Sequence, residues 1–277
     1  MVLDNLCQPF LKWAGGKRQL LPAINKLIPE NYSTYYEPFV GAGAVLFDMQ
    51  PKKAVINDAN EELINVYRVI KNNIDELIFD LKEHINEEDY YYDVRKLDRT
   101  KEYKNMSDVK KASRILFLNK TCYNGLFRVN QQGEFNVPFG RYKNPNIVNE
   151  ETLRAVHDYL NNNDVRILNV DFEEAIKYMR KEAFVYFDPP YHPISDTSSF
   201  TGYTTDGFDA QDQKRLKKLC DSLDERGCRF LLSNSSADLI VDLYQDDYTL
   251  DFVDANRSIN SKGDSRGEIK EVLVRNY

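Results

Sequence analysis

The chain has 277 residues, 42% of them hydrophobic, and a formal net charge of −7; this length allows one large domain, or a core domain carrying an insertion, with a substantial hydrophobic core. The negative charge argues mildly against a protein that coats nucleic acid through bulk electrostatics, and four cysteines without a CxxC pair argue against a zinc site or a disulfide framework. No apolar stretch reaches membrane-spanning length and the N-terminus lacks a signal-peptide pattern, so we expect a cytoplasmic protein with no membrane partner and no metal.

A glycine-rich basic loop is the first distinctive segment, at residues 9–18. It contains the only tryptophan, Trp13, together with two glycines and three cations. Its spacing differs from GxxxxGK[ST], which argues against a P-loop. We interpret Lys17 as a candidate ligand for a carboxylate.

Two predicted strands follow, at residues 35–39 and 54–57. The first leads into EPFVGAG at 37–43, where the glycines let a ligand approach the backbone closely. The second ends at Asp58, which can accept hydrogen bonds from a ribose diol bound at the glycine turn. The alternative for Asp58 is a helix cap with Glu61 as its partner, and both roles can coexist.

Residues 61–163 interrupt the alternation of strands and helices. Helical patterns recur after Asn60 and over 73–85 and 108–118, and residues 124–145 are rich in turn formers. Within this region, residues 111–143 carry six basic side chains against one acidic one, a local charge of +5 that leaves −12 for the rest. Aromatic and amide side chains are interleaved with these cations, which favours contact with phosphates and bases over a solvated charge run.

The alternation resumes after this region, with strands predicted at 165–168, 184–187, 229–233, 248–253 and 271–275 and a helix carrying Leu216, Leu219 and Leu223. Such alternation predicts a doubly wound α/β sheet of the Rossmann-like kind. We therefore predict a core domain formed by 1–60 and 164–277, with 61–163 as an inserted, mainly helical domain. A Ser-, Thr- and Gly-rich loop at 195–208 could close over a substrate.

The most informative segment is Asp188-Pro189-Pro190-Tyr191, directly after the apolar run 184–187. Neither proline can donate a backbone hydrogen bond, so the turn presents carbonyls and one carboxylate. The Asp188 carboxylate and the Pro189 carbonyl could accept both N–H groups of an exocyclic amine on a nucleobase, while Tyr191 stacks on its ring. The alternative is a plain proline turn after a buried strand.

Together these segments resemble the Dam family of DNA adenine N6-methyltransferases, which includes relatives from restriction systems. The resemblance covers nearly the whole chain through FLKWAGGK at 10–17, EPFVGAG at 37–43, NDAN at 57–60 and DPPY at 188–191. CYNGLFR at 122–128 and GEFNVPFGRYK at 133–143 resemble the target-recognition hairpin of that family. Residues 83–106 have no recognisable counterpart.

The resemblance implies S-adenosylmethionine as the cofactor and double-stranded DNA, at GATC sites, as the substrate of a protein that is associated with the nucleoid when bound to DNA. It implies a methyltransferase sheet with an inserted target-recognition domain, in a monomer or a weak dimer. The implied catalytic residues are Asp188, Pro189, Pro190 and Tyr191. The implied cofactor-binding residues are Trp13, Lys17, Glu37, Phe39, Gly41, Gly43, Asp58, Asp171, Phe172 and Asp188. Phe172 could equally be a core residue.

The implied DNA-binding residues form a separate group. Arg128 and Lys12 would each contact a guanine, Tyr123 and Asn124 would wedge into the duplex, and Lys143 would touch phosphate. The full group is Lys12, Tyr123, Asn124, Leu126, Arg128, Pro138, Arg141, Tyr142 and Lys143.

Several alternatives remain at this point. The acceptors of the proline turn do not distinguish adenine N6 from cytosine N4, and such turns also serve enzymes that methylate RNA or protein glutamine. Cytosine C5 methylation is disfavoured because the chain has no Pro-Cys pair to supply a nucleophile. A non-catalytic DNA-binding protein on the same frame is a further alternative. A nicotinamide oxidoreductase is a weaker one, because the GxG of the glycine turn lacks the full GxGxxG pattern and none of the three histidines has a convincing acid/base setting.

Overall fold

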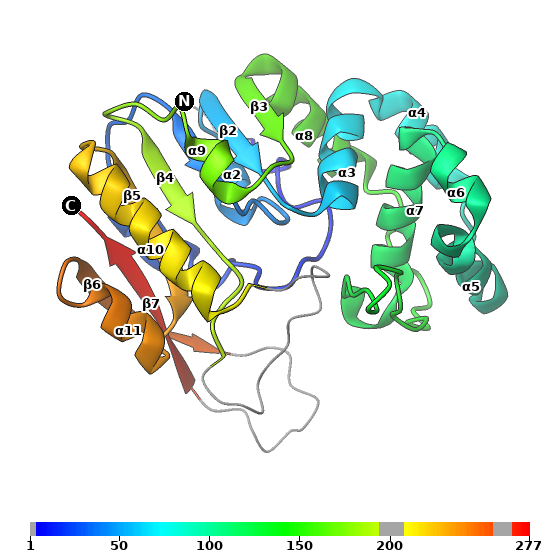
Figure 1. Ribbon diagram of the computed structural model, residues 1–277. Helices are drawn as coiled ribbons and strands as arrows, with labels where there is room; N and C mark the ends of the chain where they lie inside the picture. Colours follow the sequence, from blue (N-terminus) through cyan, green and yellow to red (C-terminus); the bar gives the residue numbers. More distant parts are fainter. Residues whose placement is uncertain (1–3, 194–207, 257–267) are drawn as a thin grey trace.

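The computed structural model describes residues 4–193, 208–256 and 268–277. Within these residues seven strands form one sheet in the order β3-β2-β1-β4-β5-β7-β6 (Figure 1). Neighbours from β3 to β5 are parallel, whereas β7 runs antiparallel to both β5 and β6. The strands are β1 (Tyr35–Glu37), β2 (Lys53–Asn57), β3 (Asp164–Leu168), β4 (Phe184–Phe187), β5 (Arg229–Ser235), β6 (Thr249–Asn256) and β7 (Glu268–Arg275).

All seven predicted strands are present, which confirms the α/β prediction. β1 ends at Glu37, earlier than predicted, because Pro38 has no N–H to continue the ladder. β6 and β7 are longer than predicted. They pair along their whole length, from Thr249 opposite Arg275 to Asn256 opposite Glu268, so the additional residues of each strand find partners in the other.

Helices cover both faces of the sheet. Along β4, Phe184 and Tyr186 face one core while Val185 and Phe187 face the other, as the period of two in a strand requires. The first face carries α1 (Leu21–Leu27), α2 (Ala44–Met49), α3 (Glu61–Asn72) and α8 (Glu150–Asn162). The second carries α9 (Phe172–Ile176), α10 (Ala210–Glu225) and α11 (Asp238–Tyr244). The sheet is therefore doubly wound.

A group of helices lies beyond α3, on the right in Figure 1. It comprises α4 (Ile74–Lys82), α5 (Glu88–Lys96), the 3₁₀ turn η1 (Leu97–Arg99), α6 (Lys101–Asn105), α7 (Asp108–Thr121) and the 3₁₀ turn η2 (Tyr123–Gly125). α7 packs against α3, α4 and α5, and its buried residues belong to the same hydrophobic cluster as the first face of the sheet. The helical region thus shares a core with the sheet. Its division from 1–60 and 164–277 as a separate domain stays a prediction.

The loop predicted over 195–208 lies, except for Phe208, outside the described residues. All four cysteines are buried and free. Among the described helices, none is both long and apolar enough to cross a bilayer.

Candidate active site

The carboxyl ends of β1, β2, β3 and β4 converge, and a single buried side chain ties three of them together. Asn57, at the end of β2, donates from Nδ2 to the carbonyls of Pro38 (3.0 Å) and Val170 (3.1 Å). Its Oδ1 accepts from the Val170 N–H at 2.9 Å. β1 lies between β2 and β4, so the strand order reverses there. In open α/β sheets, such a switch point is where ligands bind.

Asp58 links the glycine turn to the start of α3. Its Oδ2 accepts from the Gly41 N–H at 3.0 Å and its Oδ1 from the Asn60 N–H at 2.9 Å. The alternative assignment of Asp58 as the helix cap is wrong, because the Asn60 side chain caps α3 by accepting from the Leu63 N–H. Burial raises the pKa of Asp58 to about 6, although the two backbone N–H groups oppose the shift. The Asp58 side chain is thus held at the carboxyl ends of the strands, where its burial makes the carboxyl group lose its proton less readily.

Gly41 and Gly43 both have positive φ angles, of 50° and 75°. A Cβ on Gly43 would lie 2.7 Å from atoms of both Phe47 and Tyr67, so packing beneath the turn requires glycine there. A Cβ on Gly41 would meet the Trp13 indole at 3.1 Å. The predicted residues Trp13, Gly41 and Asp58 are therefore brought together.

The Asp188 carboxylate follows β4 and is held from two sides. Lys17 Nζ lies 2.8 Å from Oδ1, and Ser233 Oγ at the end of β5 donates to the same oxygen at 3.1 Å. Both contacts from the described residues thus fall on Oδ1. Burial raises the pKa of Asp188, and the Lys17 ammonium opposes the shift and favours the ionised form. The carboxylate predicted for Lys17 is therefore one of the protein's own.

The rest of the proline turn is fixed from behind. The Tyr191 hydroxyl donates to Glu271 Oε2 on β7 at 2.5 Å, and the Pro190 carbonyl accepts from Gln213 Nε2 on α10 at 3.0 Å. Lys17 Nζ lies 4.5 Å from the centroid of the Tyr191 ring, so it occupies one face of that ring. A base stacking on Tyr191 would have to use the opposite face.

Glu37 completes an acidic group with Asp58 and Asp188. It is buried, and the Tyr35 hydroxyl donates to its Oε2 at 2.7 Å. Burial raises the pKa of Glu37 well above its usual range, and the charges of Asp188 and Asp58 raise it further. A bound cation would relieve this mutual repulsion, so the site suits a positively charged ligand that also carries hydroxyl donors.

Asp171 and Phe172 lie at the start of α9, across the second face. Asp171 caps this helix by accepting from the Glu173 N–H, and it pairs with Arg215 at 3.1 Å. Phe172 is 6% exposed and packs against Phe39, with ring centroids 5.4 Å apart. The structure thus brings Phe39 and Phe172 together within a core, and their contact with a cofactor stays a prediction.

The segment predicted as a hairpin forms two antiparallel arms after α7. They meet at isolated bridges, Cys122 with Phe139 and Val129 with Phe135. Trp13 stacks on Phe127 of the first arm with centroids 4.7 Å apart and 26° between the planes. The basic loop therefore contacts both the glycine turn and the hairpin arms.

Most predicted DNA-binding side chains are exposed on these arms. Tyr123 is 57% exposed, and Asn124, at φ 59°, donates its backbone N–H to the Tyr142 hydroxyl. Arg128 is half-buried and donates from Nε to Asn136 Oδ1 at 2.7 Å. Leu126 is half-buried, and the exposed residues are Lys12, Tyr123, Asn124, Pro138, Arg141, Tyr142 and Lys143.

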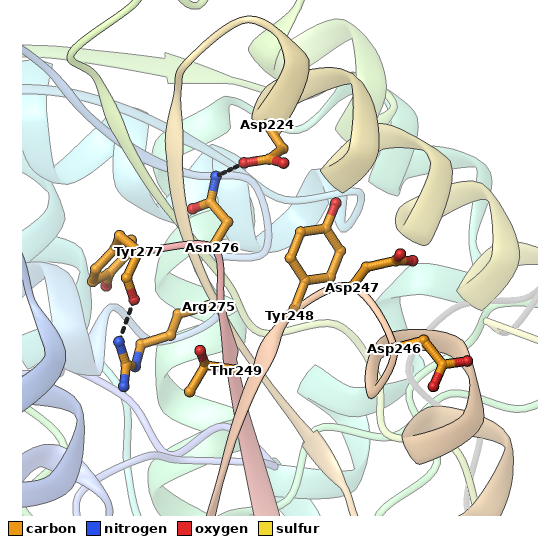
Figure 2. Close-up of a pocket in the computed structure, with 8 residues that line it drawn as sticks. All are labelled: Asp224, Asp246, Asp247, Tyr248, Thr249, Arg275, Asn276 and Tyr277. Carbon is orange, nitrogen blue, oxygen red and sulfur yellow. Dashed lines mark hydrogen bonds between the residues drawn. The ribbon is translucent and has the colours of Figure 1, made fainter.

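A separate hollow of about 320 Å³ lies at the opposite edge of the sheet (Figure 2). It opens where β6 begins and β7 ends, near the amino end of β5. Its polar groups bond to one another, as Asn276 does to Asp224 and Arg275 to the Tyr277 carbonyl. It is lined by Asp224, Asp246, Asp247, Tyr248, Thr249, Arg275, Asn276 and Tyr277, and it is not part of the candidate active site.

Comparison with known proteins identifies the family. The family described as "D12 class N6 adenine-specific DNA methyltransferase" matches residues 13–259, which include the basic loop, the glycine turn and the proline turn. The chain belongs to this family. The D12 class assignment makes it an adenine N6 DNA methyltransferase, and it implies S-adenosylmethionine and DNA as its cofactor and substrate.

Full-length relatives of this D12 class chain agree with the assignment. A type II methyltransferase of Lactococcus lactis subsp. cremoris is 48% identical over 98% of this chain and 95% of its own length. Another, from Methanocaldococcus jannaschii, is 47% identical over 98% of this chain and 99% of its own. A DNA adenine methylase of Escherichia coli (strain K12) is 35% identical over 96% and 94%. These similarities remove the oxidoreductase and the non-catalytic protein from the alternatives.

The acidic strand ends fit S-adenosylmethionine, which carries a sulfonium, an ammonium and a ribose diol. The sequence analysis assigned no individual role to several residues that support this D12 class site, namely Asn57, Ser233, Gln213 and Glu271. Ser233 carries a signal, because it is a polar residue at the carboxyl end of the apolar run 229–232. Glu271 carries none, because its place depends on β7 inserting between β5 and β6.

Proposed function

We propose that this chain methylates adenine N6 within GATC sites of double-stranded DNA, with the target base flipped out of the helix. The observation that carries the proposal is the Asp188 carboxylate at the switch point, where the contacts from Lys17 and Ser233 both fall on Oδ1, so that Oδ2 could accept from a substrate amine. The alternative is methylation of another exocyclic amine or another DNA site.

In the proposed reaction, the chain orients the amine. The lone pair of adenine N6 is delocalised into the ring, and hydrogen bonds from its two N–H groups to Asp188 Oδ2 and the Pro189 carbonyl would favour a pyramidal nitrogen. The chemistry supplied by bound S-adenosylmethionine is an already activated methyl group, so orientation matters more than a strong base. Burial raises the pKa of Asp188, and the Lys17 ammonium opposes this rise, which favours the ionised form that acts as an acceptor.

Tyr191 would stack on the flipped adenine with the ring face that Lys17 leaves uncovered. Its hydroxyl bond to Glu271 fixes the plane of the ring before the base arrives. Asp58 would accept hydrogen bonds from the ribose hydroxyls of the cofactor, with Trp13, Gly41 and Glu37 beside it. Contact of Phe39, Asp171 and Phe172 with the adenine ring of the cofactor belongs to the same proposal.

DNA recognition is assigned to the hairpin arms. Arg128 would contact a guanine, Lys12 another, and Tyr123 with Asn124 would fill the space left by the flipped base. The exposure of Lys12, Tyr123 and Asn124 supports the assignment. So does the stacking of Trp13 on Phe127, because Trp13 also contacts Gly41 and the arms therefore lie beside the glycine turn.

The test is methylation of a randomised duplex library with purified protein, followed by mapping of the modified bases. We expect N6-methyladenine confined to GATC, with an Asp188→Asn variant as the inactive control. Modification of cytosine N4, or of adenine in a different consensus, would refute the proposed specificity while leaving the family assignment in place.

A further inference from the structure

A fully buried arginine lies at the centre of the helical region. Arg114 on α7 is 1% exposed, and its Nη2 pairs with Asp98 Oδ2 at 2.7 Å. Its Nε donates to the Val94 carbonyl at 3.0 Å and its Nη2 to the Arg95 carbonyl at 2.8 Å. A buried charge is costly unless it is paired, and a well-packed apolar pair of similar volume often gives equal stability. The ion pair therefore calls for an explanation other than stability.

Asp98 connects this arginine to the hairpin arms. The same oxygen that pairs with Arg114, Oδ2, accepts the backbone N–H of Phe135 at 2.7 Å. Asp98 lies in η1, and its side chain is 9% exposed. Arg114 thus fixes a carboxylate that in turn holds the backbone of the second arm.

Neighbouring side chains hold the same arm. The Val137 carbonyl accepts from the Tyr91 hydroxyl at 2.8 Å and from Arg95 Nη1 at 3.1 Å. The Phe135 carbonyl accepts from Arg99 Nη2 at 3.3 Å. The two arms are joined by isolated bridges and by a few backbone hydrogen bonds, such as that from the Asn136 N–H to the Arg128 carbonyl at 3.0 Å. The side chains of Tyr91, Arg95, Arg99 and Asp98 supply partners for the backbone groups of Phe135 and Val137, and so add to the few bonds that fix the second arm.

The register of the second arm decides where Arg128 lies. Phe135 and Val137 are buried, so the residue between them, Asn136, points to the other side. There Asn136 Oδ1 accepts from Arg128 Nε at 2.7 Å and its carbonyl from Nη2 at 3.4 Å. A shift of the arm by one residue would exchange its inward and outward side chains and move the partner of Arg128.

We propose that Asp98, held by the buried Arg114, is a positioning residue that determines DNA specificity by setting the register of the second hairpin arm and hence the orientation of Arg128. This inference rests on the proposed role of Arg128 as a reader of guanine. Within the described residues, neither Asp98 nor Arg114 contacts the glycine turn at 37–43, so the pair acts on the choice of DNA site.

The decisive variant replaces the pair by apolar residues, Arg114→Met with Asp98→Leu. It removes both charges of the buried pair, and Glu62, which lies 3.8 Å from Arg114 Nη1, keeps the Tyr103 hydroxyl as a hydrogen-bond partner, so the protein is expected to fold. The acceptor for the Phe135 N–H is lost. Selectivity for GATC over sites with one altered base should fall by roughly ten- to hundred-fold, the discrimination that one bidentate contact supplies. S-adenosylmethionine affinity, measured by equilibrium dialysis, should stay within about twofold of the wild type. Unchanged selectivity in the folded double variant would overturn the proposal.

A second variant tests the chain of contacts without touching the buried pair. Asn136→Ala removes the acceptor that holds Arg128 and should lower selectivity at the same base pair. Unchanged selectivity here also refutes the inference. The matched control is Ile78→Val in α4, a buried change that should lower stability without altering selectivity.

Arg128→Ala separates failure of this inference from failure of the proposed function. If Arg128→Ala lowers selectivity and the double variant and Asn136→Ala do not, only the positioning role is wrong. If Arg128→Ala itself leaves selectivity unchanged, the role of Arg128 is wrong, and the positioning role falls with it.

Discussion

Acidification is expected to weaken binding of S-adenosylmethionine through Asp58. Burial is the largest cause of the rise of its pKa to about 6, and the charge of Asp188 adds to the rise. The ionised carboxylate is the form that accepts hydrogen bonds from both ribose hydroxyls and attracts a cationic ligand. Binding should therefore favour ionisation of Asp58 and release a proton near its pKa.

The magnitude follows from the titration. At about one pH unit below the pKa, roughly one molecule in eleven has Asp58 ionised, so the apparent affinity should be about tenfold weaker than at about pH 8. Near pH 6, binding should release about half a proton per site.

Calorimetry in two buffers of different ionisation enthalpy measures both the affinity and the protons released. Circular dichroism at each pH controls for folding, and Asp58→Asn should bind more weakly at neutral pH with this pH dependence removed. S-adenosylhomocysteine shares the ribose but lacks the sulfonium charge, so it separates the contribution of the diol from that of the cation. Equal affinity at about pH 5 and pH 8, with no proton released by the folded protein, would refute the role of Asp58.

The remaining predictions concern stability and specificity. Because the folded-state pKa of Asp58 is raised to about 6, its contribution to the free energy of unfolding is fully present below the unfolded pKa near 4 and is lost as the pH rises through about 6. The loss should be at most about 3 kcal/mol. Plots of the unfolding free energy against pH, from urea titrations of wild type and Asp58→Asn, should differ in slope across this window, and parallel plots would contradict this. Asp188→Asn should abolish turnover but not DNA binding, and should cost about 1–3 kcal/mol because the buried Lys17 loses its charged partner; substantial turnover in methyl-transfer assays would count against the catalytic role. Arg128→Ala should lower the free energy of discrimination between bases at one base pair by about 1–3 kcal/mol. Lys143→Ala should weaken binding to all sequences alike and reduce the salt dependence of binding. Equal effects of the two variants on selectivity would argue against a base-reading hairpin. Gly43→Ala should destabilise by more than about 1 kcal/mol, because its φ is 75° and the new Cβ would collide with Phe47 and Tyr67; an unchanged melting temperature would disprove this reading of the turn.

Local chemistry made the proline turn at 188–191 readable from the sequence. Pro189 and Pro190 lack N–H groups wherever the chain places them, so the acceptor-rich character of the turn after Phe187 follows from the residues alone. The strands were readable for a similar reason, because the two-residue period of burial is a property of each strand by itself. The same holds for Asp58, whose position at the end of an apolar run placed it at a ligand-binding edge.

Contacts between distant segments were decided only by the tertiary structure. The pairing of Lys17 with Asp188 needs the basic loop to cross the end of β4, and the bond from Ser233 needs β5 to lie beside that strand. A burial pattern shows which side chains point inward but not which strand is the neighbour, and so the insertion of β7 between β5 and β6 was not predictable. Arg114 looked like one cation of a DNA-binding block. Folding instead buried it against Asp98, because only the packing of α7 on α5 and η1 supplies the carboxylate and carbonyls that a buried guanidinium requires.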